Sequence, residues 1–245
     1  SLDTEEKLSP RTPNNAAEML AEYIRIRRGW LKEIELLAVE KPFAVLLDPK
    51  DTSAVYVGRR DKDFRFQDFI YCGEHKTTTS YKKDGGFKNL WIDSFSPNSQ
   101  IDGYNHSGHI DYGSYFRGVW IDGALVHKKE RHFKFIPISR MTEMMDAWLS
   151  DTKKWIASLL AEITALDLER MERDNGYKLP YLRAFPKNTD SCQDYGSSCA
   201  YINLCKAWGN PEDHPNPPDN FVVEKWEPFK ELELSKIGLK DEEIK

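Results

Sequence analysis

Runs of apolar residues, separated by short polar turns, mark the first half of the chain. Three of these runs are rich in β-branched and aromatic residues, and their short polar connections favour antiparallel neighbours. Two further runs flank the Asp122-Gly123 dipeptide, which predicts a turn between them. The predicted strands span residues 34–47, 54–61, 69–77, 116–121 and 131–138.

Helical signals lie before, between and after these strands. Asn15 can cap a helix over residues 16–28, and Ser96, followed by a proline, predicts the start of a second helix. Ser139 can cap the longest helix, over residues 140–173. An apolar stripe follows one side of this helix: Met141, Met145, Trp148, Trp155, Leu159, Ile163 and Leu166. The order of elements predicts an α/β fold with a mixed central sheet flanked by helices.

The 245 residues are enough for one large domain with an appendage. We expect residues 16–176 to form this domain and residues 177–245 to form a cysteine-rich C-terminal region with a charged tail. Residues 1–15 are polar and begin with Ser1 instead of Met. This segment could be a processed tail, the remnant of a tag, or the cut end of a longer protein.

The composition excludes several classes of protein. Apolar residues make up 40% of the chain and the mean hydropathy is −0.65. This apolar content is too high for a disordered protein. The sequence also lacks the long uninterrupted apolar run of a membrane helix. The net charge of −5 argues against a generally basic surface, although it leaves room for a local basic groove. A chain with no signal peptide and an uneven cysteine distribution is expected in the reducing cytoplasm.

Two carboxylates and a lysine are the sharpest chemical signal. Asp61 ends one predicted strand, and Glu74 and Lys76 lie two residues apart on the next, so that the latter two share one face. If these strands pair, Asp61 comes beside them, and a divalent cation such as Mg²⁺ or Mn²⁺ would offset the cost of gathering the charges. The alternative is a salt bridge on a half-exposed strand.

Gln100 and Tyr104 share one face of the following helix, since they are four residues apart. An amide beside a phenol can hydrogen-bond a phosphate or an unstacked base. The alternative is an amphipathic helix without a function.

The G-x-x-D, E-x-K and Q-x-x-x-Y motifs, in this order, resemble the PD-(D/E)XK nuclease superfamily and its RecB-like branch. The AVEKPF strand, the threonines after Lys76 and the FRGVWIDG strand extend the resemblance over about residues 16–208. It is closest to phage-type relatives of the CRISPR-associated iron–sulfur exonuclease family. The resemblance implies a restriction-endonuclease-like core and a DNA exonuclease, encoded by a phage or its bacterial host. Such an enzyme acts on single strands or DNA ends in recombination, replication or repair, with recombination proteins as partners.

The resemblance also implies a role for each motif residue. Asp61 and Glu74 would be ligands of Mg²⁺ or Mn²⁺, with the backbone carbonyl of His75 as a third ligand. Lys76 would be the catalytic lysine, and Gln100 and Tyr104 would help to hold the active site and DNA. The side chain of His75 is expected on the opposite face of the strand. Cys72 is expected to be a buried free thiol.

Three of the four cysteines, Cys192, Cys199 and Cys205, fall close together near the C-terminus. The resemblance implies that they hold a [4Fe–4S] cluster, with the fourth cysteine in an absent N-terminal segment, because no cysteine precedes Cys72. We expect their sulfur atoms to converge. The alternatives are zinc with His214 as fourth ligand, or three thiols without metal.

Two further expectations follow from the resemblance. The acid of the first family motif would lie in the absent segment, or Glu18 or Glu22 would supply it. The glycine-bearing loop after the third strand would contact DNA through its lysines and aromatic rings: Tyr81, Lys82, Lys83, Phe87 and Lys88. The alternative for this loop is that it is only solvated and does not contact DNA. For the function of the whole chain, the alternatives are a catalytically inactive DNA-binding or structural relative, or a site-specific endonuclease on the same fold.

Overall fold

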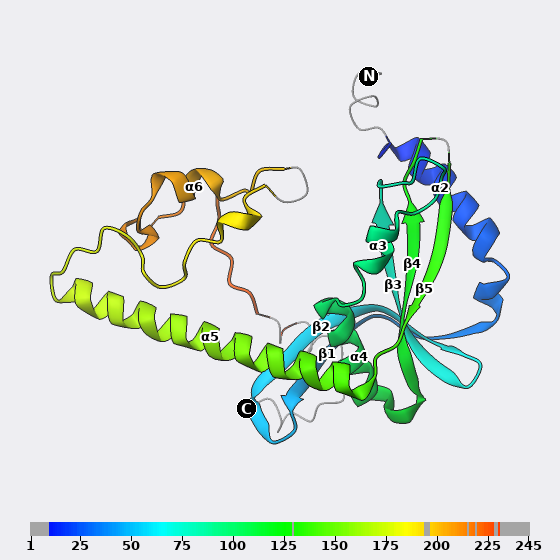
Figure 1. Ribbon diagram of the computed structural model, residues 1–245, viewed down its shortest axis with the longest axis horizontal. Helices are drawn as coiled ribbons and strands as arrows, with labels where there is room; N and C mark the ends of the chain where they lie inside the picture. Colours follow the sequence, from blue (N-terminus) through cyan, green and yellow to red (C-terminus); the bar gives the residue numbers. More distant parts are fainter. Residues whose placement is uncertain are drawn as a thin grey trace. The chain divides into compact units, whose positions relative to one another are not determined.

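The computed structural model describes residues 10–128, 130–193, 197–214, 216–218, 220–227 and 230, apart from the side chains of residues 51–53. The chain divides into two units within its longest helix (Figure 1). The first unit comprises Ser1–Leu149 and Glu227–Lys245 and contains the sheet, and the second is Ser150–Trp226. The division falls inside this helix, and the domain boundary expected after residue 176 stays a prediction.

Five strands form one mixed sheet, as the sequence predicted. The strands are β1 (Ile34–Asp48), β2 (Asp51–Phe66), β3 (Phe69–Thr78), β4 (Phe116–Leu125) and β5 (His132–Ile138), and they lie side by side in chain order. β3 and β4 pair in parallel, and the other neighbours pair antiparallel. The parallel pair requires a crossover, which the chain makes through helices.

The three helices that the sequence predicts are present, with different ends, and two short helices that it did not predict, α3 and α6, are added. The described helices are α2 (Pro13–Arg27), α3 (Asn89–Asp93), α4 (Ser99–Tyr112), α5 (Thr142–Asp174) and α6 (Ile202–Ala207), with short 3₁₀ turns η1 (Trp30–Lys32), η2 (Gly113–Tyr115), η3 (Thr189–Ser191) and η5 (Pro211–Asp213). α2 is capped by Thr12, whose side chain accepts from the Asn15 backbone N–H, and not by Asn15. α4 is capped by Asn98, and not by Ser96.

Asp122 and Gly123 do not form the predicted turn. They lie inside β4, where they pair with Phe135 and Lys134 of β5. The absence of a side chain at Gly123 makes room for the Trp91 ring, because a Cβ atom there would lie 2.7 Å from it. The dipeptide is therefore a packing feature of a central strand.

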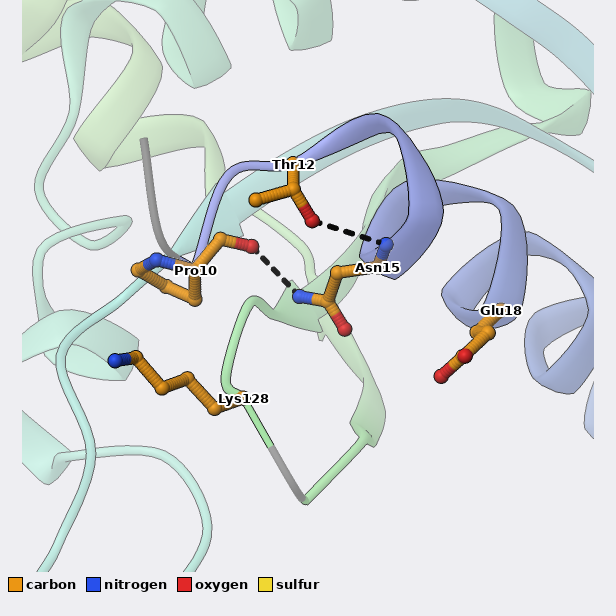
Figure 2. A pocket seen from close by; sticks show the side chains of 5 residues that line it. All are labelled: Pro10, Thr12, Asn15, Glu18 and Lys128. Atoms are coloured by element: carbon orange, nitrogen blue, oxygen red, sulfur yellow. Dashed lines mark hydrogen bonds between the residues drawn. The ribbon is translucent and has the colours of Figure 1, made fainter. Parts of the chain in front are cut away.

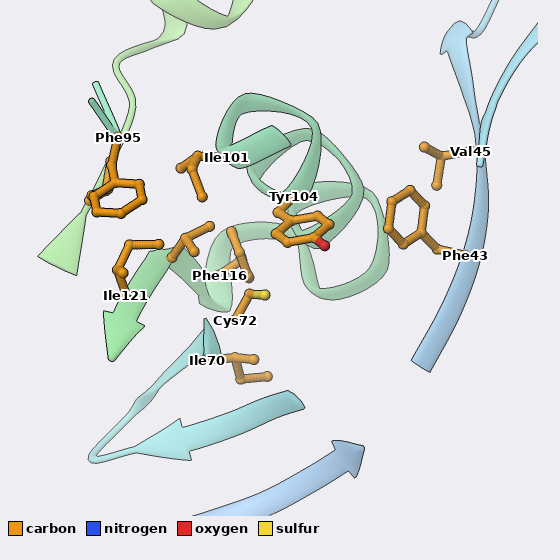
Figure 3. Packing of buried hydrophobic residues seen from close by; sticks show 11 residues of the cluster. Phe43, Val45, Ile70, Cys72, Phe95, Ile101, Tyr104, Phe116 and Ile121 are labelled. Atoms are coloured by element: carbon orange, nitrogen blue, oxygen red, sulfur yellow. The ribbon is translucent and has the colours of Figure 1, made fainter. Parts of the chain in front are cut away.

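α4 packs on one face of the sheet over the main hydrophobic core. Cys72 and Ile70 of β3 and Phe116 and Ile121 of β4 point toward this helix, as Figure 3 shows. The full cluster comprises Phe43, Val45, Ile70, Cys72, Phe95, Ile101, Tyr104, Phe116, Val119, Ile121 and Ile138. This core holds α4 rigidly against β3, where the candidate site lies.

α2 and the η1 turn cover the opposite face. Tyr23 and Arg27 both bind Asp122, at 2.6 and 2.7 Å. Trp30 packs against Phe64, at a centroid distance of 5.3 Å. Successive residues of a strand point to opposite faces, so the contacts of Asp122 place α2 on the face away from Ile121.

In the second unit, the C-terminal half of α5 organises the segment that follows it. The buried carboxylate of Glu169 accepts hydrogen bonds from the backbone N–H groups of Arg183 and Ala184. Trp155 and Ile163, from the predicted apolar stripe, are 67% and 41% exposed within the structure. No described helix is both long and apolar enough for a membrane span.

Candidate functional site

The polar site lies between β3 and α4, at the edge of the hydrophobic core. Glu74 and Lys76 point from β3 toward α4 because they are two residues apart on one strand. Gln100 and Tyr104 point back from the first turns of α4 because they are four residues apart on one helix. The local periodicity of two elements therefore brings these four side chains together, as their sequence spacing predicts.

A continuous chain of hydrogen bonds joins them. Lys76 Nζ lies 2.7 Å from Glu74 Oε1 and 2.9 Å from Gln100 Oε1. Gln100 Nε2 donates to the hydroxyl of Tyr104 at 3.0 Å, and that hydroxyl donates to the carbonyl oxygen of Arg59 at 3.0 Å. The amide of Gln100 thus fixes the lysine on one side and the phenol on the other.

Glu74 carries the unusual feature of the site. Its side chain is only 5% exposed, and while Oε1 binds Lys76, the buried Oε2 atom has no partner in the part of the chain described. Burial raises the pKa of the Glu74 carboxyl; Lys76 opposes this, and the Asp61 carboxylate reinforces it. An unpartnered buried carboxylate oxygen costs free energy unless a further group binds it.

Asp61 completes the acidic pair from β2. Its Oδ2 atom accepts the backbone N–H of His75 at 3.1 Å, and its negative charge raises the pKa of the neighbouring Glu74 carboxyl. Asp61, Glu74 and Lys76 therefore gather on the α4 side of the sheet.

The donor atoms at this site fit a hard divalent cation. Mg²⁺ is commonly held by one or two carboxylates and several waters, and Mn²⁺ also suits oxygen donors. Asp61 and Glu74 supply two carboxylates, and the backbone carbonyl of His75 lies between Glu74 and Lys76 in the chain. Among the described residues, no three His, Cys, Asp or Glu side chains gather as a metal-ligating group. Carboxylates, a backbone carbonyl and water would have to make up such a site.

The side chain of His75 lies on the other face, as strand alternation predicts. Its Nε2 atom is 2.7 Å from Lys62 Nζ, and its ring is 6.0 Å from that of Tyr23 on α2. Partial burial and then the Lys62 ammonium lower the pKa of His75. Its imidazole is thus directed away from Glu74 and Lys76.

The expectation that Glu18 or Glu22 supplies a further acid is wrong. Both residues lie on α2, which covers the face opposite to Glu74. Glu18 binds Arg131, and Glu22 binds Arg25 at 2.6 Å. The sheet separates these carboxylates from the site.

The cysteines do not form the predicted metal centre in this structure. All four are free, and Cys72 lies in the hydrophobic core, where burial raises its pKa well above the usual value. Cys192, Cys199 and Cys205 do not gather as a ligand group within the described residues, so the expectation that their sulfur atoms converge is wrong. A [4Fe–4S] cluster held by these cysteines stays a prediction from the sequence.

The proposed fourth zinc ligand, His214, has a different contact. Its ring stacks on Trp208 at a centroid distance of 4.0 Å. It forms no ligand group with the cysteines in the described chain.

The loop after β3 is a small hairpin. Tyr81 pairs with Phe87, and the backbone N–H of Lys82 donates to the carbonyl of Gly86 at 3.0 Å. Phe87 is buried and stacks on Trp91 at 4.9 Å, so it is not available to stack on a base. Tyr81 is 47% exposed, and Lys83 and Lys88 are also exposed. Contact of these three residues with DNA stays a prediction.

Sequence reasoning missed a buried network next to Asp61. Arg60 binds Asp63 of its own strand, and Ser107 and Asp111 of α4. A usable signal was present, because Ser107 and Asp111 continue the spacing of Gln100 and Tyr104 along α4.

A cavity of about 280 Å³ lies at the start of α2, away from these residues (Figure 2). Asn15 donates from Nδ2 to the Pro10 carbonyl at 2.7 Å beside it. Its lining residues are Pro10, Thr12, Asn15, Glu18 and Lys128. None of the residues of the candidate site lines it.

Among known proteins, matches to this chain come from solved structures. No protein-family model matches the chain, and no curated protein matches it. A crystal structure from Eubacterium rectale, described as a "Putative exonuclease", aligns with a TM-score of 0.41 and 14% sequence identity. The alignment covers 89% of this chain and 64% of that one, so this chain spans less than two thirds of the other protein. The functional argument therefore depends on the geometry of the site.

Proposed function

We propose that this chain is a metal-dependent nuclease that hydrolyses phosphodiester bonds in DNA. The observation that carries the proposal is the buried Oε2 atom of Glu74, which has no partner among the described residues although Asp61 and Lys76 adjoin it. Two carboxylates beside a lysine are the arrangement that binds a divalent cation and a phosphate together.

Each residue has a role in this proposal. Asp61, Glu74 and the carbonyl of His75 would hold Mg²⁺ or Mn²⁺. The ion supplies charge that stabilises the phosphate transition state and makes bound water more acidic. The Lys76 ammonium, held by Glu74 and Gln100, orients the attacking water. Its side chain is 30% exposed, so water and substrate can reach it.

Gln100 and Tyr104 act as supports for this lysine. The amide oxygen of Gln100 accepts from Lys76, and the amide nitrogen donates to Tyr104, so a rotation of the amide would break both bonds. Tyr104 in turn is fixed to the backbone of β2 at Arg59. This arrangement keeps the lysine directed toward Glu74 before substrate arrives.

We propose an exonuclease in preference to an endonuclease, with single strands or DNA ends as substrate. This choice, and a role in phage recombination, replication or repair, rest on the sequence resemblance alone. Lys83, Lys88 and the exposed ring of Tyr81 are the proposed contacts to the DNA backbone and bases.

The test is hydrolysis of end-labelled linear DNA and of circular single-stranded DNA, with Mg²⁺, with Mn²⁺ and with a chelator. Degradation of the linear substrate alone, in a metal-dependent manner, supports the exonuclease. Cleavage of the circle would favour an endonuclease. Absence of hydrolysis with either metal would overturn the proposal and leave a DNA-binding relative.

A matched pair of variants shows whether the activity belongs to this site. Asp61→Asn should abolish it. Asp68→Asn, an exposed carboxylate in the turn between the same two strands, should retain it. Equal activity in Asp61→Asn and wild type would exclude this site.

A further inference from the structure

β2 and β3 stop pairing immediately before the site. Their paired register ends with Lys62 opposite Gly73. The next two residues, Asp61 and Glu74, are the proposed metal ligands. The ladder between the strands therefore does not fix their separation.

One stripe of α4 contacts both sides of this gap. Residues of the stripe are four, three and four positions apart, which places them on one face of the helix. They are Gln100, Tyr104, Ser107 and Asp111. The first two contact the residues of β3 and the backbone of Arg59, as described above, and the last two contact Arg60 of β2.

Arg60 joins the two elements through a fully buried guanidinium. Nη1 donates to Ser107 Oγ at 2.8 Å, and Nη2 donates to Asp111 Oδ2 at 2.5 Å. Nε and Nη2 also donate to the two carboxylate oxygens of Asp63, at 2.8 and 2.9 Å. A planar guanidinium with this many fixed bonds allows little sliding of β2 along α4.

We propose that Arg60 is a positioning residue for Asp61, which follows it in the chain. By fixing β2 to the α4 stripe that also holds Lys76, it sets the distance between the two carboxylates. The inference rests on the proposed function where it is tested by Mn²⁺ binding, and it is independent of that function where it is tested by hydrogen exchange without metal. Removing the Arg60 contacts would then disturb the site more than the fold.

The chain offers a matched control for this contact. Lys41 donates to the same Asp111 carboxylate at 2.9 Å, but it comes from β1, which carries no residue of the site. Lys41→Met removes the β1 contact and leaves that of Arg60. Ser107→Ala removes a bond of Arg60 with little change in volume, and Arg60→Lys keeps the charge but loses the planar group.

The first readout is amide hydrogen exchange without metal. The His75 N–H binds Asp61 Oδ2 directly, so its exchange reports the position of Asp61. We expect Ser107→Ala and Arg60→Lys to speed exchange at His75 by about tenfold, with Phe64 and Tyr71 of the β2–β3 ladder unchanged. Lys41→Met should leave all three amides as in wild type.

The second readout is affinity for Mn²⁺, measured by calorimetry. We expect the same two variants to bind about tenfold more weakly, as is usual when a group that orients metal ligands is lost. If Arg60→Lys does not fold, Ser107→Ala carries the test.

Three results would overturn the inference: unchanged exchange at His75 in folded Ser107→Ala, an equal rise at all three amides, or an equal effect of Lys41→Met. A wild type that binds no Mn²⁺ and cleaves no DNA would instead contradict the proposed function, and the exchange at His75 would still decide the role of Arg60.

Discussion

The phenol of Tyr104 donates to the carbonyl oxygen of Arg59 while it accepts from Gln100, so both of its hydrogen-bonding functions are occupied within the protein. Burial, and then the charge of Glu74, raise the pKa of Tyr104. A phenol that is neutral and already bonded in this way is suited to holding the site in place and poorly suited to proton transfer.

Tyr104→Phe should therefore weaken hydrolysis without abolishing it. The ring would still pack edge-on against Phe43, and the loss of the hydroxyl contacts should cost about 0.5–1.5 kcal/mol of stability. We expect kcat to fall by about tenfold or less, as measured on linear DNA. A loss as complete as that of Asp61→Asn would contradict a supporting role.

Glu74→Gln should abolish Mn²⁺ binding and leave the fold intact or more stable. The wild-type protein holds a carboxylate that is almost inaccessible to solvent and half unpartnered. A neutral amide of the same shape relieves that cost, by about 1 kcal/mol. Thermal unfolding without metal, together with Mn²⁺ calorimetry, checks both expectations. A large fall in stability would show that Glu74 is needed for the fold.

Lys76→Ala should separate metal binding from catalysis. The lysine binds a carboxylate oxygen that is not the unpartnered one, so its removal leaves the proposed metal ligands in place. We expect hydrolysis to fall by at least about 10²-fold, which is typical for a group that positions or activates a nucleophile. Mn²⁺ affinity should persist in the same variant, and its loss would contradict the assigned role.

Asp122→Ala should detach α2 from the sheet. It leaves the buried Arg27 without its partner at 2.7 Å, which costs about 3–5 kcal/mol for ion pairs of this kind. Chemical denaturation measures the loss, and hydrogen exchange should locate it in α2. Glu22→Gln, which removes an exposed ion pair on the same helix, is the control and should have no measurable effect.

The cysteines yield a prediction about the metal content of the purified protein. Because Cys192, Cys199 and Cys205 do not gather as ligands in the described chain, the purified protein should contain little iron and lack the brown absorbance of an iron–sulfur protein. Elemental analysis and a visible spectrum test this. Stoichiometric zinc bound by His214 would instead favour the Cys₃His alternative.

The sequence was sufficient where local periodicity decides the outcome. Alternation along a strand placed Glu74 and Lys76 together and His75 opposite them, and helical spacing paired Gln100 with Tyr104. It was insufficient for Asp122 and Gly123, because a dipeptide typical of turns was placed in a central strand by tertiary contacts. Arg27 and Tyr23 satisfy the buried acid, and Trp91 occupies the space beside the glycine.

The role of Arg60 could not be predicted for a related reason. A charged residue on a predicted strand is ordinarily exposed, and only the packing of α4 on β2 buries this one. Similarly, nothing in the sequence of α2 indicated which face of the sheet it covers, and this alone excludes Glu18 and Glu22 from the site.

The parallel pairing of β3 with β4 has a consequence for how the protein folds. Asp61 and Glu74 come from a hairpin and can meet early, because little chain separates them. Lys76 meets Gln100 only when the crossover through α3 and α4 has closed and β4 has joined the sheet. The acidic pair would thus form before Gln100 holds Lys76 in place, so that a nascent chain would expose both carboxylates to solvent until α4 packs over them.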